Sequence, residues 1–87
     1  MVWVGGTVVD LTDRQLLLKE ALGSKVGLKR LGQDATAFFQ VAGGKWERVD
    51  PASAVEKGAR ACVETLMDGQ NLLALRVFLG TDCGPTA

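Results

Sequence analysis

The chain of 87 residues contains no histidine. It therefore has no imidazole that could act as a general base or ligate a metal, and Ser-His and Cys-His catalytic pairs are excluded. Its two cysteines, Cys62 and Cys83, stand far apart in the sequence and cannot form a zinc site without other ligands. We accordingly assign no metal site, no cofactor and no catalytic residue from the sequence.

The chain also lacks an excess of either charge, since ten basic and ten acidic residues cancel. Without a long-range field to attract nucleic acid or an anionic membrane, only a local patch could bind them. No apolar stretch is long enough to span a bilayer, and the start "MVWVGG" lacks the basic residues and the apolar run of a signal peptide. We expect a cytoplasmic protein with reduced thiols and no membrane partner.

Apolar residues make up 47% of the chain and charged residues 23%, which is typical of a globular domain and too apolar for disorder. A chain of this size buries roughly 60–65% of the surface that its unfolded form exposes, so its stability is modest. We expect one domain over residues 1–80, followed by a flexible C-terminal tail over residues 81–87.

The first elements are predicted from composition and from a capping pattern. Residues 2–9 are rich in β-branched side chains and predict a strand. Thr12 and Gln15 fit a capping box, and they predict a helix over residues 13–22 that ends at Gly23. Residues 25–31 fit neither a helical nor a strand period clearly, and we interpret them as a strand that ends in a turn.

The stretch "ATAFFQVAGGKWERVDP" contains the clearest local signals. Gly43 and Gly44 can both take the positive φ that a two-residue hairpin turn requires. That turn sets Val41 opposite Trp46, so we interpret Trp46 as a structural residue of the hairpin. The same register places Phe39 opposite Arg48 and Phe38 opposite Val49.

The second half predicts a helix and a central strand. Asp50 and Pro51 have the residue types of a helix N-cap and first helical position, and small apolar residues recur at helical spacing through residues 51–68. Residues 71–79 are apolar on both faces, which is typical of a central strand. The predicted fold is an α+β domain with a four- or five-stranded mainly antiparallel sheet and two helices packed on one face.

Two helices on one face would leave Trp3, Leu72, Ala74 and Phe78 to account for, because the first and last strands are apolar on both faces. An exposed apolar patch of more than a few hundred Å² is unusual on a small monomer, and self-association commonly covers it. We therefore expect a non-catalytic binding or regulatory module that acts as a homodimer, with a small apolar ligand pocket as a competing use of that surface.

Two alternatives stay open. The first is an RNA- or DNA-binding domain that uses a short basic and aromatic patch, and the second is a small enzyme with a carboxylate at a dimer cleft. The sequence favours a non-enzymatic role. The candidate binding residues are Trp3, Phe38, Phe78, Lys25, Lys29 and Arg30.

Overall fold

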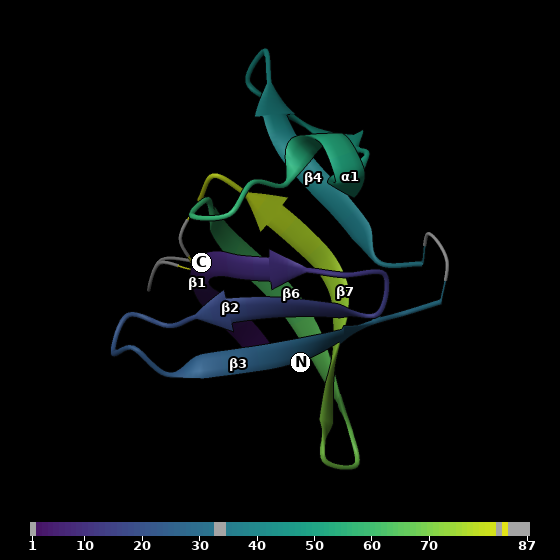
Figure 1. Ribbon diagram of the computed structural model, residues 1–87. Helices are drawn as coiled ribbons and strands as arrows, with labels where there is room; N and C mark the ends of the chain where they lie inside the picture. The colour runs from purple at the N-terminus through teal and green to yellow at the C-terminus, as the bar shows by residue number, and fades with distance from the viewer. Residues whose placement is uncertain (1, 33–34, 82, 84–87) are drawn as a thin grey trace.

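The computed structural model describes residues 2–32, 35–81 and 83. Within these residues the chain forms seven strands and one short helix (Figure 1). Their bounds are β1 (Val2–Leu11), β2 (Gln15–Lys19), β3 (Lys25–Arg30), β4 (Ala37–Ala42), β5 (Lys45–Val49), α1 (Pro51–Ala54), β6 (Arg60–Asp68) and β7 (Asn71–Leu79). The predicted α+β fold with two helices on one face of a four- or five-stranded sheet is therefore wrong.

Five of the strands form a partly closed barrel. The sheet order is β3-β2-β1-β6-β7-β4-β5, and an additional parallel pairing joins β3 to β7. The ring β1-β2-β3-β7-β6 is a five-stranded, partly open Greek-key arrangement. The β4–β5 hairpin and α1 lie outside this ring, attached through parallel pairing of β4 with β7 (Figure 1).

The predicted hairpin is confirmed in turn and in register. Gly43 and Gly44 have φ values of 60° and 80°, and Val41 pairs with Trp46 as the two-residue turn requires. The side chain of Asp50 accepts a hydrogen bond from the Ala52 backbone N–H, which confirms the predicted N-cap. These features depend only on neighbouring residues, so the local sequence was sufficient to specify them.

The helix predicted over residues 13–22 is wrong, because this segment contains β2. The capping residue still acts locally: Thr12 Oγ1 accepts hydrogen bonds from the backbone N–H groups of Arg14 and Gln15, but in the turn between β1 and β2. Leu16 and Leu18 are both fully buried and point into the barrel, which is the period of two of a strand. Three consecutive leucines satisfy either period, and the pairing with β1 and β3 decides for the strand.

The helix predicted over residues 51–68 ends after one turn. α1 closes at Val55, whose backbone is extended, and Gly58 takes a φ of 90° before β6 begins. In β6 the buried residues run continuously from Ala61 to Thr65, because the inward side chains fill the barrel and the outward ones are covered. Small apolar residues at mixed spacing thus predict a helix for a segment that forms a strand buried on both sides.

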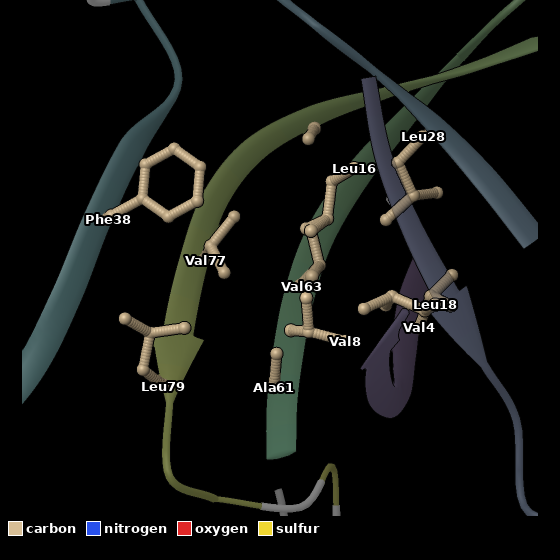
Figure 2. Close-up of a cluster of buried hydrophobic side chains, with 11 residues drawn as sticks. Val4, Val8, Leu16, Leu18, Leu28, Phe38, Ala61, Val63, Val77 and Leu79 are labelled. Atoms are coloured by element: carbon tan, nitrogen blue, oxygen red, sulfur yellow. The ribbon is translucent and has the colours of Figure 1, made fainter. Parts of the chain in front are cut away.

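The core is almost entirely aliphatic, and Phe38 is its single aromatic side chain among the described residues (Figure 2). A ring of only five strands leaves an interior that side chains fill completely. Thr36, at the connection into β4, is also buried and donates to the Ala74 carbonyl at 2.7 Å. The buried hydrophobic residues are Val4, Val8, Leu16, Leu18, Leu28, Phe38, Ala61, Cys62, Val63, Ala74, Val77 and Leu79.

Cys62 and Cys83 form a disulfide, so the expectation of reduced thiols is wrong. Cys62 lies on the outer side of β6, and Cys83 crosses β1 at Gly5, where an added Cβ would come within 3.2 Å of the Cys83 Cβ. Glycine at position 5 therefore leaves the space that the disulfide occupies. Of the tail expected over residues 81–87, residues 82 and 84–87 lie outside the described part of the chain.

Candidate functional site

Four aromatic side chains gather on the outer side of the sheet, and we call this set the aromatic face: Trp3, Phe39, Trp46 and Phe78. Phe78 lies at its centre, with its ring centroid 6.0 Å from Trp3, 5.3 Å from Phe39 and 5.1 Å from Trp46. The Phe39 and Phe78 rings are stacked, and Trp46 meets Phe78 edge to face. Such ring pairs stabilise one another by about 0.5–1.5 kcal/mol beyond their buried area.

Strand register explains why these four residues share one side. Phe39 pairs directly with Phe78 across β4 and β7, and residues that pair directly point to the same side of a sheet. Trp46 pairs with Val41, two residues along β4 from Phe39. On the other flank, Gly5 pairs with Cys62 and Cys62 pairs with Phe78, so Trp3, two residues before Gly5, also faces outward.

The two tryptophans remain substantially exposed. Trp3 is 45% exposed and Trp46 is 44% exposed, although both rings contact Phe78. The chain contains only two tryptophans and three phenylalanines, and of these only Phe38 belongs to the core. Aromatic side chains bury the most apolar area per residue, so a small domain that keeps four of them outside has a surface suited to recognition.

A bidentate ion pair lies beside the aromatic face. Arg76 donates from Nε to Glu64 Oε1 at 2.7 Å and from Nη2 to Oε2 at 2.8 Å, and its guanidinium lies 5.6 Å from the Phe78 ring centroid. The hydrogen bond from Arg76 lowers the pKa of the Glu64 carboxyl, against the opposing effect of its burial. The same contact raises the pKa of Arg76. The pair fixes a charged, planar group next to exposed rings.

A groove of about 750 Å³ begins at Trp3 and runs across the outer side of β1. Its lining includes Gly5, Gly6, Lys19, Arg60 and Cys83. Because Trp3 belongs to both, the groove adjoins the aromatic face.

Of the six candidate binding residues, the structure brings two together. Trp3 and Phe78 are both part of the aromatic face. Phe38 is buried in the core, and Arg30 lies over its ring, 5.3 Å from the centroid, on the opposite side of β3 from Lys25 and Lys29. The predicted basic and aromatic patch is thus divided among separate surfaces.

The sequence interpretation did not assign Phe39 and Trp46 to a binding surface. The sequence predicts Trp46 as a structural residue opposite Val41, yet Val41 is 53% exposed and the indole packs on Phe78. The signal was present in part, because the predicted hairpin register already set Phe39 and Trp46 on one side. The missing information was the pairing of β4 with β7, which brings them to Phe78.

A second, weaker surface lies on the outer side of β2 and β3. Lys19 pairs with Lys25, and Lys29 pairs with Gln15, while two of the pairs between them, Leu16 with Leu28 and Leu18 with Val26, point toward the core. These residues therefore form a short lysine stripe, defined as Lys19, Lys25 and Lys29. It contains no aromatic side chain.

Two kinds of feature are absent from the described part of the chain. No helix there is long and apolar enough to cross a membrane. No group of three or more acidic, cysteine or histidine side chains in those residues is arranged to hold a metal ion.

Comparison with protein-family models, with curated proteins and with solved structures finds no match for this chain.

Proposed function

We propose that the protein is a non-catalytic binding module whose aromatic face holds a neutral oligosaccharide. The observation that carries the proposal is the gathering of four of the five aromatic residues around Phe78 on the outer side of the sheet. The C–H-rich faces of sugar rings pack on aromatic side chains, and their hydroxyl groups need nearby hydrogen-bonding partners. Indole N–H groups supply donors there, and the Glu64–Arg76 pair lies within the same surface.

Charge and redox state support this choice of ligand. With ten basic and ten acidic residues, the chain offers little attraction to a polyanion, and a neutral sugar chain needs none. The disulfide between Cys62 and Cys83 favours an oxidising compartment, where such bonds persist. The cytoplasmic location expected from the sequence rested on the missing signal-peptide pattern and membrane span, and the disulfide favours an oxidising compartment instead.

Binding is tested by titrating the protein with cellohexaose and chitohexaose and following tryptophan fluorescence and calorimetric heat. We expect saturable binding at sub-millimolar ligand, because open aromatic surfaces without deep pockets give modest affinity. Trp3→Ala and Trp46→Ala should each weaken it at least tenfold. Met67→Ala is the matched control, since Met67 is 55% exposed but lies at the far end of β6, outside the aromatic face. Equal effects of all three substitutions, or no binding of either sugar, would overturn the proposal.

A second candidate is weak single-stranded nucleic-acid binding through the lysine stripe. Some five-stranded, partly open Greek-key barrels use the surface of their second and third strands for oligonucleotides, and here that surface carries Lys19, Lys25 and Lys29. The analogy concerns the fold alone. Oligo-dT binding that disappears in Lys25→Ala/Lys29→Ala and persists in Trp46→Ala would support this candidate. Sub-micromolar affinity at ~150 mM salt would make it the preferred function.

The alternative of a small enzyme stays a prediction without a supporting contact. Glu64 is the buried carboxylate of the described residues, and Arg76 holds it ionised in a bidentate pair. Because both carboxylate oxygens accept from the guanidinium, Glu64 acts here as an anchor for Arg76.

A further inference from the structure

Strand β5 is the open end of the sheet. Within the described residues it pairs only with β4, and the sheet order ends with it. Four consecutive residues of β5, from Lys45 to Arg48, are exposed. An open strand edge presents unpaired backbone N–H and C=O groups, to which a further strand can bind.

The hairpin geometry identifies which backbone groups point outward. In a two-residue hairpin the residues that flank the turn, here Ala42 and Lys45, form a hydrogen-bonded pair. Because hydrogen-bonded and non-hydrogen-bonded pairs alternate along an antiparallel ladder, the backbone groups of Trp46 point away from β4. A strand added at this edge can therefore bond to the backbone of Trp46.

We propose that a second copy of this chain adds its own β5 there, antiparallel and centred on Trp46. In this register Trp46 faces Trp46 of the second copy as a hydrogen-bonded pair. On the other side of the sheet, Lys45 faces Glu47 of the second copy, and the same contact occurs twice by symmetry. These are non-hydrogen-bonded pairs, in which the Cα atoms approach to about 4.5 Å and side chains lie closest.

The two neighbouring symmetric registers are unfavourable because they place like charges opposite each other. A pair centred on Glu47 sets two Glu47 carboxylates directly opposite each other, and a pair centred on Lys45 does the same with two ammonium groups. Like charges directly opposite are destabilising. The sequence Lys45-Trp46-Glu47 thus favours the register centred on Trp46, because each lysine then faces a glutamate of the other copy.

This arrangement has a consequence for the aromatic face. The twofold axis of an antiparallel strand pair is perpendicular to the sheet, so both copies present their aromatic faces on the same side. Trp46 of each copy lies at the junction, and the two faces become one continuous strip. The interface goes beyond the proposed sugar binding and does not require it.

The test uses analytical ultracentrifugation of the full chain over a range from about 5 µM to about 1 mM, since one short strand buries less than the ~1,600 Å² of an ordinary interface. We expect the mass to rise from the 9.2 kDa of one chain toward twice that value. A 9.2 kDa particle at every concentration would overturn the proposal.

Charge exchange tests the register. Lys45→Glu and Glu47→Lys should each weaken self-association at least tenfold, because each creates two like-charge pairs. The double variant, which exchanges both charges, should associate as the parent does. Mixing the two single variants should give a heterodimer, because every central pair is then complementary.

Circular dichroism checks that each variant is folded, which we expect because Lys45 and Glu47 are exposed. Association that is indifferent to both single changes would contradict the register centred on Trp46. Titration of the monomeric Glu47→Lys variant with the sugars separates the two proposals. Retained sugar binding in this variant supports both proposals. Loss of sugar binding counts against the sugar proposal and not against the dimer.

Discussion

Glu64 places a carboxylate on the outer side of β6, where the residue is only 6% exposed and Arg76 supplies two hydrogen bonds. Its pKa is lowered below the ordinary 4.5, so the pair stabilises the fold above that pH and the contribution is lost as the pH falls through the folded-state value. Glu64→Gln should therefore cost about 1–3 kcal/mol at neutral pH and much less in acid.

The free energy of unfolding of Glu64→Gln, measured by urea denaturation at several pH values, checks this prediction. Glu56→Gln serves as the control, because Glu56 is an exposed carboxylate and reports the effect of losing one negative charge. An equal loss in the free energy of unfolding at every pH would show that the ion pair is not the source of the effect.

Gly6 and Gly27 form a second comparison at the scale of single residues. A Cβ at Gly6 would lie 2.6 Å from the backbone carbonyl oxygen of Lys19, and the neighbouring strand cannot move away cheaply. We expect Gly6→Ala to destabilise the fold by about 1–3 kcal/mol. At Gly27 the nearest atom is the flexible amide end of Gln15, so Gly27→Ala should change stability by less than about 0.5 kcal/mol. Thermal denaturation that ranks the two variants in the opposite order would contradict the close approach of β1 and β2.

At the scale of elements, the disulfide ties the segment after β7 to β6. It closes a loop with a sequence separation of 21, and the loss of chain entropy in the unfolded state predicts a stabilisation of about 3 kcal/mol. Reduction, or the double substitution Cys62→Ser/Cys83→Ser, should lower the free energy of unfolding by that order. Thiol titration of the denatured, unreduced protein should find no free thiol, and two free thiols per chain would contradict the bond.

The sequence predicted those elements that depend on neighbouring residues. The hairpin register and the Asp50 cap follow from Gly43-Gly44 and Asp50-Pro51 alone, and both are confirmed. The helices over residues 13–22 and 51–68 are wrong, because their short apolar runs satisfy either period and strand partners decide between them. The same limit applies to the site: Trp3 and Phe78 were named, but the parallel pairing that adds Phe39 and Trp46 joins segments far apart in the sequence.

At the scale of the whole molecule, closure of the barrel requires contacts that are distant along the chain. Lys29 pairs with Leu73, and Ala37 with Arg76, so both parallel pairings close long loops. Such topologies fold slowly, and we expect refolding of the oxidised protein in milliseconds to seconds. Stopped-flow tryptophan fluorescence measures this rate, and relaxation within microseconds would be incompatible with the described strand order.

The β4–β5 hairpin lies outside the closed ring, so β5 and the ring strands meet different packing requirements. Residues of the ring must fit a filled interior, whereas β5 contributes only Val49 to the packing against the core. The turn and β5 can therefore change in length or in edge charges while the barrel stays intact. A library randomised at positions 45–48 should yield folded variants that bind new partners. The barrel could then serve as a scaffold in which β5 is the variable strand.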